Sequence, residues 1–131
     1  LEGFWWQEDS DTIDYANKNG FNFISLIRLP DFVTKADFDW AVREATNKKK
    51  ADFSKVEFLT YDEGVCVQCM HVGSYDDEPK TVALMHEYMK ANGYELDITN
   101  VRYHHEIYLS DPRKCAGEKL KTVVRHPIKK V

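Results

Sequence analysis

The stretch His104-His105-Glu106-Ile107-Tyr108-Leu109-Ser110-Asp111 decides how the rest of the chain is interpreted. Its residues alternate as in a β-strand, so successive side chains point to opposite faces of a sheet. One face then carries His104, Glu106 and Tyr108. The other carries His105, Ile107 and Leu109, which we expect to pack against a helix. A buried carboxylate is costly. If its face lines an apolar cleft, Glu106 therefore has a functional reason to be there.

The composition limits the possible partners. The chain has 131 residues, which favours a single domain, and 13% of them are aromatic. The net charge of −4 argues against direct binding of nucleic acid, which requires a basic surface. No apolar run is long enough to cross a membrane. An acidic, aromatic-rich chain suits planar aromatic or cationic small molecules.

The cysteines indicate a reducing compartment and no metal site. Their odd number gives no disulfide framework, so we expect a cytoplasmic protein. Cys66 and Cys69 form a C-x-x-C pattern inside a strand-like run, where the two thiols face opposite sides, so we interpret both as structural. A zinc site lacks a second ligand pair. We therefore expect neither a cofactor nor a metal.

The pattern of elements predicts an α+β fold in one domain, residues 1–131. Capping signals predict helices over 34–48 and 79–92, and Asp9-Ser10-Asp11 is typical of a turn. Strands are predicted over 4–6, 21–29, 56–61, 65–72, 103–109 and 120–128.

The order of these elements suggests an internal repeat. Residues 56–128 are interpreted as a second repeat, in which 65–128 should form one β-α-β-β unit. The 24–30 strand echoes residues 121–127, since each has an arginine two residues before a proline. Residues 1–33 are then the end of a first repeat, followed by a helix and connector over 34–55. That first unit lacks its opening strand and helix, so we expect residues before Leu1.

Several of these segments together resemble a known family. They are Val67–Asp77, the proline-initiated helix, His105–Pro112 and Leu120–Pro127. The combination resembles the GyrI-like small-molecule-binding domains, which are related to the effector domains of multidrug-sensing transcription regulators. The resemblance covers 56–128 strongly, and Trp5-Trp6 and Arg28-Leu29-Pro30 extend it through 1–55. It implies two pseudo-symmetric β-α-β-β units with a ligand cleft at their junction.

The resemblance also implies a role for Glu106, which would point into the cleft. The tryptophan pair and the Arg28–Phe32 stretch look closest to a stand-alone branch without a DNA-binding domain. Some members of that branch hydrolyse strained cyclopropane rings in DNA-alkylating natural products. Glu106 could bind a cationic ligand or activate a water molecule, with its pKa raised by apolar walls, and the residues do not choose between these roles.

The remaining candidate residues are phenols and aromatic walls. Tyr108 and Tyr61 are candidates to join Glu106 in catalysis by polarising a ligand carbonyl. The candidate ligand-binding residues are Trp5, Trp6, Tyr103, His104 and Met70. Strand alternation allows only one of the two adjacent tryptophans to face the cleft.

Two functions from different classes remain open. The leading hypothesis is a small-molecule binding protein that hydrolyses a strained electrophilic xenobiotic through water activated by Glu106. The alternative is a non-catalytic protein that sequesters a drug or modulates gyrase. Both imply a planar aromatic or cationic ligand, no membrane contact and no direct nucleic-acid contact, and a homodimer is left open.

Overall fold

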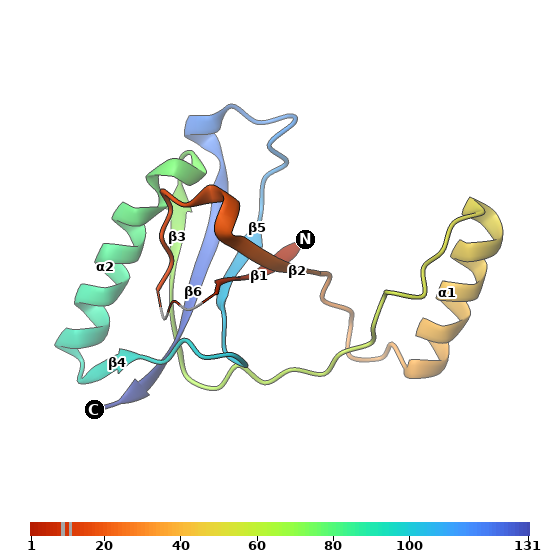
Figure 1. Ribbon diagram of the computed structural model, residues 1–131, viewed down its shortest axis with the longest axis horizontal. Coiled ribbons are helices and arrows are strands. Elements are labelled where there is room, and N and C mark those ends of the chain that lie inside the picture. Colours follow the sequence, from red (N-terminus) through yellow and green to blue (C-terminus); the bar gives the residue numbers. More distant parts are fainter. Residues whose placement is uncertain (9, 11) are drawn as a thin grey trace. The chain divides into compact units, whose positions relative to one another are not determined.

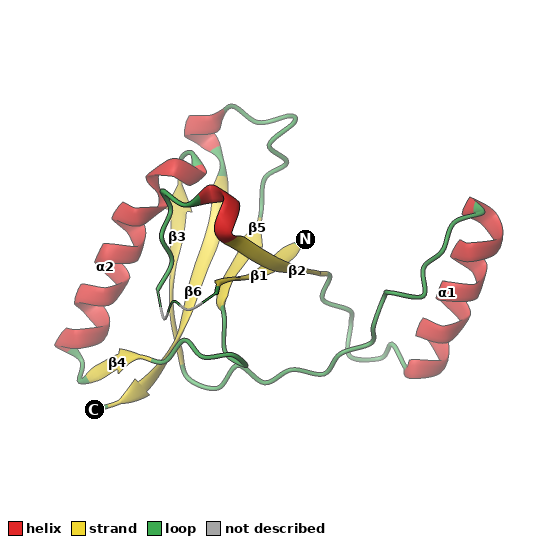
Figure 2. Cartoon of the chain, viewed as in Figure 1, coloured by secondary structure: helices red, strands yellow, loops and turns green. Residues whose placement is uncertain are grey.

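The computed structural model describes residues 1–8, 10 and 12–131, so the turn predicted at Asp9-Ser10-Asp11 lies partly outside the described residues. Two compact units are present: Leu1–Ile27 together with Glu63–Val131, and Arg28–Asp62. The larger unit contains an antiparallel sheet and helix α2, Glu78–Ala91 (Figures 1 and 2). The smaller contains helix α1, Lys35–Lys49. The predicted α+β class is confirmed.

The sheet joins two strand pairs side by side. Its order is β2-β1-β5-β6-β3, and β4 pairs with the end of β6. The strands are β1 Glu2–Gln7, β2 Phe21–Leu26, β3 Cys66–Val72, β4 Tyr94–Leu96, β5 His104–Tyr108 and β6 Lys121–Lys130. In the connections that the structure describes lie three short 3₁₀ helices: η1 Lys18–Gly20, η2 Tyr75–Asp77 and η3 Gly117–Lys119. The pairing of β1 with β5 brings the end of the first predicted repeat against the second.

One face of this sheet carries both helix α2 and the side chains of β5 that were predicted to be functional. Glu106 of β5 lies opposite Val124 of β6, so both side chains share a face. Helix α2 packs on that face, where Met85 and Met89 join Val67, Val124 and Ile128 in the core. The expectation that the helix packs behind the other face of β5 is wrong. The apolar residues that attract α2 belong to β3 and β6, so the helix covers those strands.

The opposite face is closed by rings and by a charged network. Phe4 stacks on Tyr103 with ring centroids 5.4 Å apart, and His105 meets Phe4 edge-on at 4.7 Å. His105 also pairs with Glu2, at 2.9 Å from Nε2, and with Glu63. Burial alone raises the pKa of Glu63, but hydrogen bonds from His105 and Arg125 outweigh it and lower that pKa overall.

The predicted strand over Val56–Tyr61 is wrong, because these residues form no strand. They belong to the smaller unit, which offers them no strand partner, and Phe58 instead packs its ring against Phe38 of α1 at 5.4 Å. The helix in that unit begins as predicted. Thr34 and Asp37 form a reciprocal capping box at its first turn.

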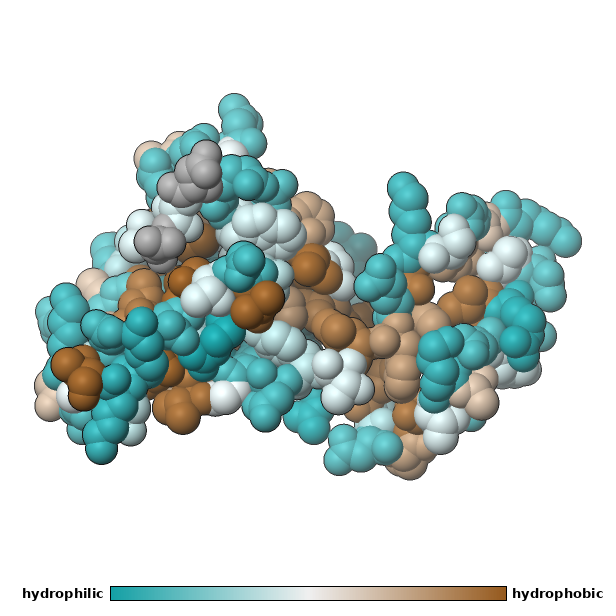
Figure 3. All heavy atoms as spheres, turned by 60° about the horizontal axis from the view of Figure 1, so that its bottom comes forward, coloured by the Kyte–Doolittle hydropathy of each residue, from teal (hydrophilic) through white to brown (hydrophobic). Residues whose placement is uncertain are grey.

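The larger unit keeps some apolar side chains on its surface. Phe23 and Ile24 are exposed on β2, and Met70 and Val72 are exposed on β3. The view in Figure 3 shows apolar patches scattered among hydrophilic side chains. Among the described residues, no helix has the length and apolar character required to cross a membrane.

Candidate functional site

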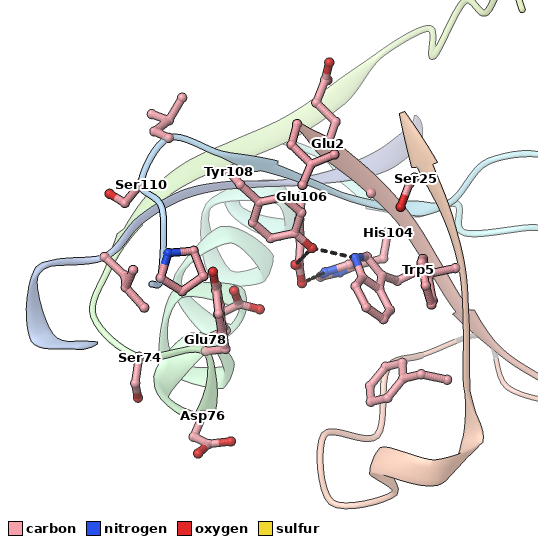
Figure 4. A pocket seen from close by; sticks show the side chains of 18 of the residues that line it. Glu2, Trp5, Ser25, Ser74, Asp76, Glu78, His104, Glu106, Tyr108 and Ser110 are labelled. Carbon is pink, nitrogen blue, oxygen red and sulfur yellow. Dashed lines mark hydrogen bonds and ion pairs between the residues drawn. The ribbon is translucent and has the colours of Figure 1, made fainter. Parts of the chain in front are cut away.

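A cavity of about 1130 Å³ opens over the part of the sheet formed by β5, β1 and β2. Its floor is the sheet face that carries Glu106, and Glu78 at the start of α2 points toward it (Figure 4). Aromatic and apolar side chains supply much of the remaining wall: Trp5, Ile13, Tyr15, Phe21, Phe23, Tyr75, Leu109 and Pro112. The cavity therefore combines a carboxylate floor with ring-lined walls.

Glu106 is held by hydrogen bonds on both carboxylate oxygens. Oε1 lies 2.8 Å from Nε2 of His104, and Oε2 accepts a 2.5 Å hydrogen bond from the Tyr108 hydroxyl. That hydroxyl in turn accepts a 2.8 Å hydrogen bond from the indole nitrogen of Trp5. Strand alternation places His104, Glu106 and Tyr108 on one face, and the pairing of β1 with β5 brings Trp5 beside them.

Gly3 allows the indole and the phenol to meet. It lies opposite Glu106 in the β1–β5 pairing, on the same sheet face. A Cβ atom at this position would come within 2.7 Å of Nε1 of Trp5 and 3.3 Å of the Tyr108 hydroxyl oxygen. The Trp5–Tyr108 hydrogen bond therefore crosses β1 directly above a residue that has no side chain.

Glu78 is the second carboxyl group of the site. It is 1% exposed in the first turn of α2, and its Oε1 atom has no hydrogen-bond partner among the described residues. One oxygen of Glu78, one ring nitrogen of His104 and one oxygen of Glu106 all lie within 4.8 Å of one another. Burial, followed by the negative charge of Glu106, raises the pKa of Glu78 to about 9.

The two carboxyl groups are shifted in opposite directions. Burial alone raises the pKa of Glu106, but the hydrogen bonds from His104 and Tyr108, and the positive charge that His104 can carry, lower it overall. The expected rise in the pKa of Glu106 is therefore wrong in direction, because the neighbouring donors stabilise its ionised form. These opposite shifts favour a single shared proton at neutral pH, with Glu78 as the preferred site.

Glu78, His104 and Glu106 are also the one group of described residues whose spacing could hold a metal ion. Both ring nitrogens of His104 and both oxygens of Glu106 already have hydrogen-bond partners. A cation would have to displace these bonds and the proton on Glu78. We therefore assign the three residues to a hydrogen-bonded acid–base group.

The structure brings four of the predicted residues together at the cavity: Glu106, Tyr108, His104 and Trp5. His104 is buried, at 1% exposed. Only Trp5 of the tryptophan pair lines the cavity, as strand alternation requires.

The other four lie elsewhere. Trp6 packs against Tyr103, whose hydroxyl donates to the Asn100 carbonyl, so neither lines the cavity. Met70 is an exposed residue of β3, and Tyr61 belongs to the smaller unit.

Sequence reasoning missed Glu78, Tyr15 and Tyr75, which line the cavity. Glu78 precedes Pro79 at a helix start, where an acidic residue is ordinary because it complements the helix dipole. Tyr15 lies in a polar connection between β1 and β2. No periodic signal marks residues that reach a site from loops and helix ends.

Comparison with known proteins identifies this architecture. A family model described as a GyrI-like small molecule binding domain matches residues 2–129. An uncharacterised conserved protein from Listeria innocua of known crystal structure is 45% identical, with a TM-score of 0.90. The alignment covers 98% of this chain and 62% of that one.

Two further crystal structures from Listeria innocua, each described as a hydrolase, are 42% and 43% identical, both with a TM-score of 0.85. They align with 98% of this chain and with 61% and 62% of their own. This chain therefore spans about three fifths of the length of these structures. Comparison with curated proteins finds no match.

The sheet, the ring-lined cavity and the matched relatives define a small-molecule-binding α+β domain. The chain belongs to the GyrI-like small-molecule-binding family.

Proposed function

We propose that the cavity binds a planar aromatic ligand and hydrolyses a strained electrophilic ring in it, such as the cyclopropane of a DNA alkylator. The observation that carries this proposal is the pair of buried carboxyl groups with opposite pKa shifts. Neighbouring groups whose pKa values are driven apart are the arrangement that acid–base catalysis uses. The hydrolase descriptions of two relatives support the same reaction class.

The two carboxyl groups take complementary roles. Glu106, which is ionised, accepts a proton from a water molecule as the water oxygen bonds to the strained carbon. The ring C–C bond breaks, and its electron pair moves through the conjugated system to the ligand carbonyl. Glu78, which is protonated, donates its proton to that oxygen. Transfer of one proton from Glu106 back to Glu78 restores the starting state.

Tyr108 and Trp5 orient the base. The Tyr108 hydroxyl donates to Glu106 and accepts from Trp5, which fixes the carboxylate against the strand. The Trp5 ring also lies against Phe23 with centroids 5.0 Å apart, so the two rings form an aromatic wall for a flat ligand. Tyr61, Trp6, Tyr103 and Met70 are not needed for this mechanism.

The test is product formation measured by mass spectrometry with a cyclopropane-bearing alkylator. Glu106→Gln should lower turnover by about 10²–10⁴-fold, which is the usual contribution of a general base. Binding of an uncharged planar ligand should change little, because the amide keeps the shape of the carboxylate. Equal turnover in the two proteins would remove Glu106 from catalysis.

A second candidate function is non-catalytic sequestration of a cationic drug. The observation that favours it is that both oxygens of Glu106 already accept hydrogen bonds, so the ionised carboxylate can attract a cation without chemistry. No product at any protein concentration, together with ligand binding by the unmutated chain, would select this function. In either case we propose action in the cytoplasm, in keeping with three free cysteines.

A further inference from the structure

Three histidines form a continuous hydrogen-bonded chain behind Glu106. Nδ1 of His104 lies 2.6 Å from Nε2 of His126, and Nδ1 of His126 lies 2.9 Å from Nε2 of His86. The first ring also contacts Glu106, at 2.8 Å from its Nε2 atom. The rings come from three separate elements, β5, β6 and α2, so local sequence does not impose their alignment.

The three hydrogen-bonded histidines run from the cavity floor toward the outside of the larger unit. His104 and His126 are 1% and 2% exposed, whereas His86 on α2 is only partly buried. Along the three histidines, each ring uses one nitrogen for the contact on its Glu106 side and its other nitrogen for the next contact outward. Every imidazole between Glu106 and the outer nitrogen of His86 therefore has one nitrogen facing each way.

The neutral rings have a defined order of protons. When Glu106 is ionised and the His104 ring is neutral, Nε2 of His104 carries the proton that it donates to Glu106, so Nδ1 of His104 accepts from His126. The same rule then places the proton of His126 on Nε2 and that of His86 on Nε2. Burial, and then the charges that His104 and His86 can carry, lower the pKa of His126 to about 2, so the middle ring stays neutral.

We propose that His86, His126 and His104 conduct protons between solvent and the Glu106–Glu78 carboxyl pair. One inward step adds a proton to Nδ1 of His86 and shifts the proton of each ring to the next group, so that Glu106 gains one proton and all three tautomers reverse. The outward step runs back from protonated Glu106 and releases a proton at His86. No ring keeps a net charge after either step.

The use of this path rests on the proposed function, because a bound planar ligand, with the one water molecule that reacts with it, would separate the carboxyl pair from bulk solvent. Four titratable groups among the described residues lie near the path. Lys90 lies one turn beyond His86, Tyr15 meets the ring of His104 edge-on at 6.4 Å, and Tyr108 and Glu78 face Glu106. Burial, followed by the charges of Lys90 and His104, lowers the pKa of His86, which favours release of protons at that end.

The test uses ¹⁵N-histidine-labelled full chain without ligand, so it does not depend on turnover. Long-range ¹H–¹⁵N spectra should show His104, His126 and His86 as neutral Nε2–H tautomers while Glu106 is ionised. In His86→Gln, the amide can still donate to His126 but cannot take up and pass on a proton. Exchange of the His126 ring N–H with water should then slow by about tenfold or more, since exchange would require local opening.

Two controls separate conduction from structure. Glu87→Gln changes an exposed neighbour on the same helix and should leave exchange unchanged. His71 is a buried histidine that is not one of the three in the proposed path, and its ring contacts Thr81 and Ser74. Its ring N–H should therefore exchange at the same rate in the unmutated protein and in both variants. Mixed tautomers or a charged His126 in the unmutated chain would overturn the proposal, as would unchanged exchange in His86→Gln. The tautomer result decides even if that variant fails to fold.

Discussion

At the scale of single residues, Glu78 and Glu106 show how surroundings divide one residue type into two roles. Glu106 receives hydrogen bonds from two neighbours, whereas Glu78 is buried and one of its oxygens has no hydrogen-bond partner in the described part of the chain. The ionised form is favoured in the first case and the neutral form in the second. This difference has a consequence for stability that does not depend on any ligand.

Glu78→Gln should change how the free energy of unfolding depends on pH. The folded pKa of Glu78, about 9, is above its value of 4.5 in an unfolded chain. Its stabilising contribution is therefore complete below pH 4.5 and is lost as pH rises toward 9, by up to about 1.4 kcal/mol per pH unit. Urea unfolding at pH 5 and pH 8 should show a smaller loss in the variant. An identical pH dependence in both proteins would contradict the assignment.

Gly3→Ala should weaken ligand binding by shifting the Trp5 ring in the cavity wall. The added methyl group must displace the Trp5 indole from the Tyr108 hydroxyl, and one such hydrogen bond contributes about 0.5–1.5 kcal/mol. The measurement is the affinity for a planar cationic dye by calorimetry. Gly117→Ala is the matched control, because a methyl group there has no atom within 4 Å. Equal affinities in both variants would show that the Trp5–Tyr108 contact is not needed for binding.

Residue alternation was sufficient to predict part of the site. It placed His104, Glu106 and Tyr108 on one face and allowed one tryptophan beside them, because a strand has a fixed period of two. It could not predict Glu78. That residue reaches the site from a helix start whose position depends on the packing of α2.

At the scale of elements, α2 determines where the cavity can be. The helix covers β3 and β6 through its apolar residues and leaves the face of β5 and β1 open. Its residue range was close to the predicted 79–92, because a proline start and a glycine after the end are local signals. The face that it covers was predicted wrongly, since alternation within β5 contains no information about the neighbouring strands.

Met85→Ala should strongly destabilise the larger unit. Met85 is 2% exposed and packs in the core between α2 and the sheet, and truncation of such a side chain costs about 2–5 kcal/mol. Leu84→Ala is the control, since Leu84 is the preceding residue and is 59% exposed. Chemical denaturation followed by circular dichroism gives both values. A similar loss in the two variants would contradict the packing of α2.

At the scale of the whole molecule, the cavity depends on long-range pairing. Residues from β1 and β5, about 100 positions apart in the chain, form its floor because the two strand pairs meet through β1 and β5. The internal echo between residues 24–30 and 121–127 suggested a repeat, and the resemblance to the GyrI-like family implied that the two units lie side by side. Residues 56–61 were predicted to form a strand and do not. They show the limit of such reasoning, because an alternating segment without a partner strand does not form a sheet.

The central claim is that planar ligands bind on the sheet face that carries Glu106 and the cavity, and not on the opposite face. Trp5 and Trp6 provide the most direct comparison, because they are adjacent in β1 and point to opposite faces. The measurement is the affinity of Trp5→Leu and Trp6→Leu for the same planar cationic dye. We predict that Trp5→Leu loses about 0.5–2 kcal/mol of binding, the usual value of a cation–aromatic contact, while Trp6→Leu binds like the unmutated chain. Equal losses in both variants, or a loss in Trp6→Leu alone, would contradict the account.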